Sequence, residues 1–379
     1  MKKLWKQQWK RYLLFTLAAL ICLYVCGVAT GNFYPYGEVE PYSDFEISWY
    51  VEELAAGVER ALLKQTVWGT VIVLFLQKAL LFRLEREEYG RSFLQTLPVK
   101  RRERVVFRIG MDCLTIVLCV AGYSSYAALR CIQNLTDLGI RLPWLPEAIF
   151  GMALTVICYL FLAEGIIAFW STLFVNGTAQ ITGTAAAVGM QIYTLVLLWY
   201  RGTGMEWIRQ LYGFFFLKAV GNCHYLSVLP DSLGGMDDLS LHWLPDPAYP
   251  PVYYKGVLWE DYMQYDIQFS HTRLYHFTHL SSYIGYALAY LGLAILLIVL
   301  SVWLSGKQEL SQNGFYFSFG RYLFSILFCI AFWVTSFSGE NRLWHKGLVS
   351  LATLLLFVVL VYAMSDKAYR RLEDTGASG

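Results

Sequence analysis

Three ionisable residues, Lys78, Asp112 and Glu164, stand within long apolar stretches of this sequence. A charged side chain in hydrocarbon is costly, so such residues usually face the interior of a helix bundle or a water-filled cavity. We predict that Lys78 pairs with Asp112 or with Glu164. Arg108 is an alternative partner for Asp112, four residues away on the same helix. These residues then either fix the packing of helices or line a polar path across a membrane.

No group of residues supports catalysis in this chain. The only Gly-Lys pair, Gly306 and Lys307, is followed by Gln and lacks the upstream glycine of a nucleotide-binding loop. The sequence contains neither His-Glu-x-x-His nor Gly-x-Ser-x-Gly. The pair Glu87-Glu88 is followed by Arg91 after two residues, whereas CAAX-type intramembrane proteases place three between them. We therefore expect no enzyme and no cofactor in this chain.

Metal and disulfide sites find little support. His271, His276 and His279 cluster without a carboxylate or Cys partner at a familiar spacing, so no metal site is predicted. Cys131 and Cys223 are the two cysteines that can reach the outer side of a membrane. A disulfide between them requires Cα atoms within about 7 Å, which the sequence leaves open.

The composition is that of a membrane protein, with 57% apolar, 17% aromatic and 15% charged residues. Soluble domains carry roughly 25% charged residues. A bilayer-spanning helix needs about 20 mainly apolar residues. The predicted fold is therefore an all-α, polytopic membrane helix bundle of eight spans, over residues 12–29, 66–82, 105–129, 148–174, 181–200, 283–304, 322–337 and 348–364.

Charge distribution orients these spans. An even number of spans places both termini on one side, and the segments on that side carry 17 Lys and Arg against 8 Asp and Glu. The opposite segments carry 11 basic and 18 acidic residues. By the positive-inside rule, both termini are predicted to be cytoplasmic, with the chain in the cell membrane. The net charge of +2 conceals this separation and indicates no nucleic-acid partner.

Three segments outside the spans have distinct character. Residues 1–11 alternate Lys with Leu and Trp, which is typical of an interfacial helix or of simple positive-inside anchoring. Residues 201–282 are too long for a structureless loop, and we expect them to form an extracellular cap between the fifth and sixth spans. Residues 83–104 are charged or amphipathic and lie between the second and third spans. Phe93, Leu94 and Leu97 recur there at helical spacing, and a helix would end at Leu97, before Pro98.

The segment from Glu87 to Arg101 resembles the cytoplasmic loop of type-2 ABC transporter permeases, the membrane subunits of many ATP-binding-cassette exporters. Members of that family commonly show an acidic residue, a glycine two to three positions later, spaced leucines ending in Leu-Pro-Val, and then a basic residue. The matching residues here are Glu87, Gly90, Leu94, Leu97, Pro98, Val99 and Arg101. Arg91 stands where the family often has Thr.

The resemblance covers residues 1–304, which we expect to form a permease-like transmembrane domain of six spans. Residues 305–379 add two spans and a cytoplasmic tail beyond the family's usual six. The resemblance implies that a coupling helix, including Glu87, Gly90, Phe93, Leu94, Leu97 and Pro98, docks on a separate ABC ATPase that carries ATP and Mg²⁺. It further implies a second permease copy or relative, and export of a hydrophobic or amphipathic substrate such as a peptide, antibiotic or lipid-like molecule.

Two other interpretations remain open. The segment 83–104 can be a solvated interfacial helix without a partner. The whole chain can instead be a non-transporting membrane sensor or immunity protein that binds an envelope ligand through the outer cap at 201–282.

Overall fold

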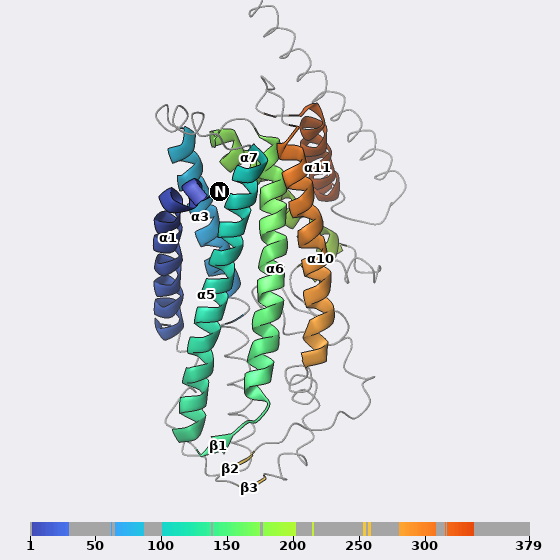
Figure 1. Cartoon of the computed structure of the whole chain (residues 1–379). Coiled ribbons are helices and arrows are strands. Elements are labelled where there is room, and N and C mark those ends of the chain that lie inside the picture. The colour runs from blue at the N-terminus through green and yellow to red at the C-terminus, as the bar shows by residue number, and fades with distance from the viewer. Residues whose placement is uncertain are drawn as a thin grey trace, which may run out of the picture. The chain divides into compact units, whose positions relative to one another are not determined.

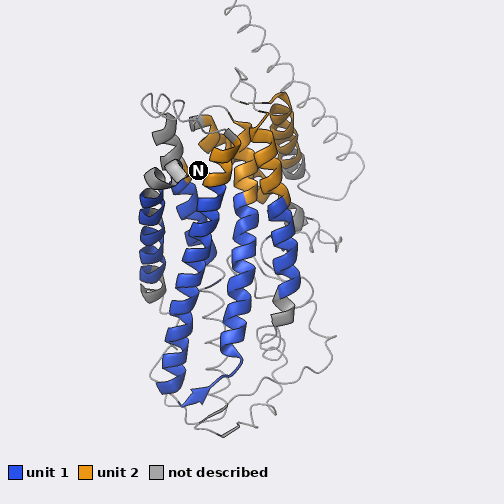
Figure 2. Ribbon diagram, viewed as in Figure 1, with its two compact units in different colours: residues 1–77, 108–164, 213–295 blue, residues 78–107, 165–212, 296–379 orange. Residues whose placement is uncertain are grey.

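The structure is a computed structural model of the chain. It describes residues 2–29, 62, 65–86, 101–137, 139–174, 177–201, 214–215, 253–254, 257–258, 280–307, 315 and 317–336. The chain divides into two compact units (Figure 2). The first unit comprises residues 1–77, 108–164 and 213–295, and the second comprises residues 78–107, 165–212 and 296–379.

The described part of the chain is helical (Figure 1). Its long helices are α1 (Lys2–Ala29), α3 (Thr66–Arg86), α5 (Arg101–Asp137), α6 (Leu145–Leu173), α7 (Gly177–Arg201), α10 (Leu280–Ser305) and α11 (Ser318–Ser336). Each overlaps the residues of one of the first seven predicted spans, and α6 and α11 end one residue before the predicted end. The eighth predicted span, residues 348–364, lies outside the described residues.

Three of these helices are long and apolar enough to cross a membrane: Arg102–Asp137, Leu145–Leu173 and Ile284–Ser305. Shorter apolar helices run over Tyr12–Val25, Thr66–Lys78 and Ser318–Ala331, and α7 falls in neither group. By length and composition, this chain is a helical, multi-pass membrane protein. At 37 residues, α5 extends about 55 Å, well beyond the roughly 30 Å of a bilayer's hydrocarbon core.

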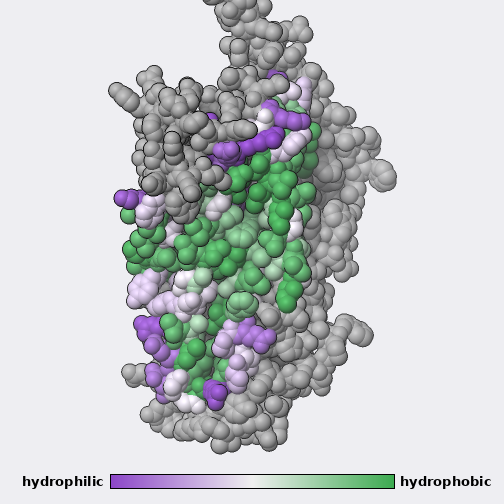
Figure 3. Space-filling model, in the orientation of Figure 1, coloured by the Kyte–Doolittle hydropathy of each residue, from purple (hydrophilic) through white to green (hydrophobic). Residues whose placement is uncertain are grey.

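Apolar side chains are turned outward on these helices. On α10, Leu288 is 64% exposed and Leu296 is 63% exposed, and on α1 Leu14 is 68% exposed. Figure 3 shows hydrophobic residues predominating on the described helices of the face in view. Exposed apolar area on this scale is unfavourable in water, so these faces are suited to contact lipid.

Helix α1 packs in the first unit through one face. Its buried residues are Tyr12, Thr16, Ala19 and Leu23, spaced at helical intervals of three and four. A side chain on Gly69 of α3 would meet Leu23, and one on Gly122 of α5 would meet Leu20 at 3.0 Å. Glycine at these two contacts lets the helices approach closely, as is common between membrane helices.

Helices α5 and α6 are joined by a tight connection that also builds a small sheet (Figure 1). Gly139 has a φ of 71°, a conformation that glycine adopts without steric cost. The strand β1 (Ile140–Arg141) follows and pairs antiparallel with β2 (Tyr253–Tyr254), which pairs antiparallel with β3 (Val257–Leu258). The predicted outer cap at 201–282 therefore contributes a β-hairpin to the α5–α6 connection. The helical fold class is confirmed, and the sheet is an addition that the sequence did not predict.

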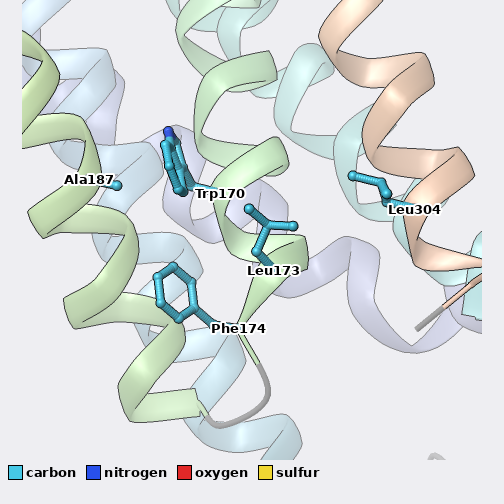
Figure 4. Close-up of a cluster of buried hydrophobic side chains, with 5 residues drawn as sticks. All are labelled: Trp170, Leu173, Phe174, Ala187 and Leu304. Atoms are coloured by element: carbon cyan, nitrogen blue, oxygen red, sulfur yellow. The ribbon is translucent and has the colours of Figure 1, made fainter. Parts of the chain in front are cut away.

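The second unit has an aromatic core at the end of α6 (Figure 4). Trp170 and Leu173 of α6, and Phe174 directly after it, gather with Ala187 of α7 and Leu304 of α10. The ring of Phe174 stacks at 4.7 Å from that of Phe315 and at 6.2 Å from that of Phe324. Aromatic pairs at such separations add packing energy beyond their buried area.

The turn from α6 to α7 is held by one side chain and one glycine. Gln180 Nε2 donates a hydrogen bond of 2.6 Å to the Ser171 carbonyl oxygen. A Cβ at Gly183 would overlap the ring of Phe174, which its aromatic neighbours hold in place. Gly183 is therefore a contact position, whereas Gly189 on the same helix has nothing within 4 Å of where a Cβ would lie.

We expect Gly183→Ala to lower stability by about 1–3 kcal/mol through overpacking against Phe174. Gly189→Ala is the matched control, because alanine favours a helix over glycine by about 1 kcal/mol and meets no neighbour there. The measurement is thermal unfolding in mild detergent. Equal midpoints for the two variants would contradict the assigned contact.

Candidate functional site

A buried hydrogen bond joins α3 to α5 in the first unit. Gln77 Nε2 donates to Asp112 Oδ1 at 3.2 Å, and both residues are 0% exposed. In a membrane interior, such a bond replaces the water that a carboxyl or amide group would otherwise contact. Asp112 is thus buried, and its carboxyl group is bonded to the neighbouring helix α3.

A second polar contact joins α1 to α5. Thr115 of α5 donates to the carbonyl oxygen of Met111 at 3.0 Å, which leaves its hydroxyl oxygen free to accept. Thr16 of α1 has one proton and two acceptors in reach, the carbonyl oxygen of Tyr12 at 2.9 Å and Thr115 Oγ1 at 3.2 Å. The hydroxyl of Thr16 can therefore switch between a bond within α1 and a bond to α5.

A third contact lies further along α5. The hydroxyl of Tyr123 donates to Gln65 Oε1 at 2.9 Å, just before α3 begins. Asp112, Thr115 and Tyr123 follow one face of α5 over about 16 Å, from the rise per residue. We call this set the polar seam, and its members are Thr16, Gln65, Gln77, Asp112, Thr115 and Tyr123.

Several buried polar atoms in the polar seam and near it have no hydrogen-bond partner among the described residues. Within the described part of the chain, Gln77 Oε1, Thr70 Oγ1 and Ser124 Oγ are buried and have no hydrogen-bond partner. Thr70 lies on the same face of α3 as Gln77, two turns away. Since buried polar atoms are nearly always satisfied in proteins, these atoms are suited to accept or donate to water or a polar group of a ligand.

The other two predicted intramembrane residues are also buried. Glu164 of α6 is 0% exposed and belongs to the first unit, and Lys78 of α3 is 6% exposed and belongs to the second. The pairing of Lys78 with Asp112 or Glu164, and that of Arg108 with Asp112, stay predictions. Gln77, which the sequence interpretation missed, is one partner of Asp112. The only feature of the sequence that could have indicated this role for Gln77 is its position in an apolar run.

Two tyrosines fix a short piece of the predicted outer cap in the first unit. Tyr159 of α6 donates to the carbonyl oxygen of Phe215 at 2.9 Å, and Tyr290 of α10 donates to that of Phe214 at 2.7 Å. The two tyrosine rings meet edge to face at 5.4 Å. The ring of Phe214 lies at 4.5 Å from that of Tyr290. We call these four residues the tyrosine clamp.

The clamp lies deep along its helices. Tyr159 is fourteen residues into α6, about 21 Å from the start of that helix and at its middle. Backbone carbonyl groups at such a depth need protein donors, because lipid offers none. The two tyrosine hydroxyls supply them. Phe214 and Phe215, which the sequence placed in the outer cap, are thus bonded to α6 and α10.

Other predicted sites fall outside the described residues. Glu87, Gly90, Phe93, Leu94, Leu97 and Pro98 lie in the undescribed stretch between the end of α3 and the start of α5. Cys223 and the histidines at 271, 276 and 279 also lie outside the described residues. Cys131 is a free, buried thiol. The described ranges contain no group of three His, Cys, Asp or Glu residues that could hold a metal ion.

Comparison with protein-family models, with curated proteins and with solved structures gives no match for this chain. The class of protein therefore follows from its own helices and buried residues: a multi-pass helical membrane protein with a polar seam inside its first unit.

Replacing Asp112 with Leu should lower stability by about 1–3 kcal/mol, because the buried amide of Gln77 would lose an acceptor. Asp112→Asn keeps an oxygen acceptor of the same shape and should cost less. Leu118→Ala, at an exposed position of the same helix, controls for a substitution in α5 that leaves the hydrogen bond intact, and thermal unfolding in detergent measures all three. Matching midpoints for Asp112→Leu and Asp112→Asn would argue against the hydrogen bond.

Removing both tyrosine hydroxyls should release the clamp. Each hydrogen bond between membrane helices contributes about 0.6–2 kcal/mol, so Tyr159→Phe with Tyr290→Phe should expose a cysteine introduced by Phe215→Cys. Labelling by a membrane-impermeant maleimide measures this exposure, in a background without other reactive cysteines. Tyr193→Phe, at an exposed tyrosine of α7, is the matched control. Unchanged labelling in the double variant would contradict the clamp.

Proposed function

We propose that this chain is the membrane-spanning permease subunit of an ABC-type transporter that exports a hydrophobic or amphipathic substrate. A separate ATPase subunit would supply ATP hydrolysis, and a second permease copy or relative would complete the transporter. The observation that carries the proposal is the position of the segment resembling a coupling helix. It connects α3 and α5, the two helices that the hydrogen bond between Gln77 and Asp112 joins.

This connection offers a mechanical route for coupling. A force applied between residues 87 and 100 acts directly on the ends of α3 and α5, since both helices adjoin that segment. The polar seam contains groups with alternative partners, such as the hydroxyl of Thr16. A relative shift of α1, α3 and α5 can exchange these bonds at little cost, whereas a wholly apolar, close-packed interface resists displacement.

The buried ionisable residues agree with a transport role. Asp112 and Glu164 are both fully buried in helices of membrane-spanning length. Retaining such residues in a span is unfavourable unless they serve packing or a pathway. With the unused hydrogen-bonding capacity of Gln77 and Thr70, the seam is suited to contact the polar end of an amphipathic substrate.

The substitution Leu94→Asp should abolish co-purification with the ATPase and should abolish transport. A charge on the predicted apolar face of the coupling helix would prevent docking. Gln95→Asp, at a neighbouring polar position, should leave assembly intact. Affinity purification in mild detergent, with ATPase activity of the eluate as readout, measures the effect. Normal assembly and transport with Leu94→Asp would sink the docking hypothesis.

The second candidate function is that of a non-transporting membrane sensor or immunity protein. The three-stranded sheet favours it, because pairing of β1 with β2 gives part of the predicted outer cap a defined structure. This function would leave the chain active without any ATPase. Binding of an envelope ligand by the purified chain, with no ATPase recovered from its native membrane, would favour it over transport.

A further inference from the structure

Two cationic residues, Arg102 and Lys307, lie near the adjoining ends of α5 and α10. The span of α5 begins at Arg102 and the span of α10 ends at Ser305, and both ends belong to the second unit. Arg102 lies against Gly306 so closely that a Cβ on that glycine would overlap the guanidinium group. Lys307 follows Gly306 directly. The chain thus brings positive charges from two different helices to one boundary.

The ammonium group of Lys307 lies against the aromatic ring of Trp303. Lys307 Nζ lies over the ring of Trp303 at 4.1 Å from its centroid, well within the range of a cation–π interaction. A turn fixes this arrangement, in which Gly306 and Lys307 donate backbone hydrogen bonds of 3.2 Å and 2.8 Å to the carbonyl oxygens of Trp303 and Leu304. Trp303 is 48% exposed, so its ring lies at the surface of the helix.

The positive charges of Arg102 and Lys307 are accessible to a ligand. Arg102 and Lys307 are both exposed, and neither makes an ion pair with an acidic residue in the described ranges, the adjacent half-buried Glu103 included. An exposed Trp beside exposed cations at the end of an apolar span is typical of the membrane interface. At that depth, the negative groups available to the cations are phosphates of lipid headgroups.

We propose that Arg102, Lys307 and Trp303 form a binding site for the headgroup of an anionic phospholipid. The two cations contact the phosphate, and the Trp303 ring packs on the glycerol and upper acyl chain. A side chain at Gly306 would displace the Arg102 guanidinium group from its present position. The exposed apolar face of α10, including Leu300 and Leu296, continues from this site as a surface for the acyl chains.

The full-length chain in mild detergent tests this site through its thermal stability as phosphatidylglycerol is added, with phosphatidylcholine as reference. We expect phosphatidylglycerol to raise the unfolding midpoint. The apparent affinity should fall about fivefold for Arg102→Gln or Lys307→Gln alone and about thirtyfold for the pair. Arg102→Lys should retain most of the affinity. Arg141→Gln removes an exposed arginine in the first unit and should change nothing.

Several outcomes would overturn the proposal. Equal stabilisation by phosphatidylcholine, or full stabilisation of the double variant by phosphatidylglycerol, would exclude an anionic-lipid site here. Equal stabilisation by inorganic phosphate would show an anion site without lipid selectivity. Loss of a co-purifying acidic protein from the double variant, with lipid response unchanged, would assign the cations to a protein partner. This test is independent of any ATPase, so it fails or succeeds separately from the proposed transport function.

Discussion

Lipid offers no hydrogen bonds, and this constraint explains where the strongly polar groups of the described helices lie. Gln77, Asp112 and Glu164, all within predicted spans, are buried at 0% exposure. Apolar side chains face outward, as on α10. The pattern is the reverse of a soluble protein's surface, because the solvent is hydrocarbon and the polar groups must find each other. The polar seam is the consequence in the first unit.

Close approach of the helices makes this arrangement possible. Gly69 and Gly122 admit leucines of α1 in the first unit, and Gly183 admits the ring of Phe174 in the second. Without a hydrophobic driving force between helices, van der Waals contact and interhelical hydrogen bonds must hold a membrane bundle together. Gly69 and Gly122 allow the close helix approach at the seam. A seam with several modest hydrogen bonds is also easier to rearrange than a wholly apolar core.

Backbone groups outside the long helices are hydrogen-bonded by other parts of the protein at two places. The tyrosine clamp satisfies the carbonyl groups of Phe214 and Phe215 deep along α6 and α10. In the three-stranded sheet, β1 of the connection between α5 and α6 pairs with β2, which comes from a distant part of the sequence and pairs in turn with β3. Both contacts involve described residues between 213 and 258, which belong to the first unit.

Apolar length and composition predicted the long helices of the described residues and their suitability for a membrane. The sequence also placed Lys78, Asp112 and Glu164 within predicted spans, and all three are buried. Only the tertiary structure decided that Gln77 bonds to Asp112, that Tyr159 holds Phe215, and that Arg102 lies on Gly306. The physical reason is that each of these contacts depends on the rotation and spacing of two chain segments far apart in sequence. Periodicity fixes which face of a helix is apolar, but it carries no information about which residue of another helix lies opposite.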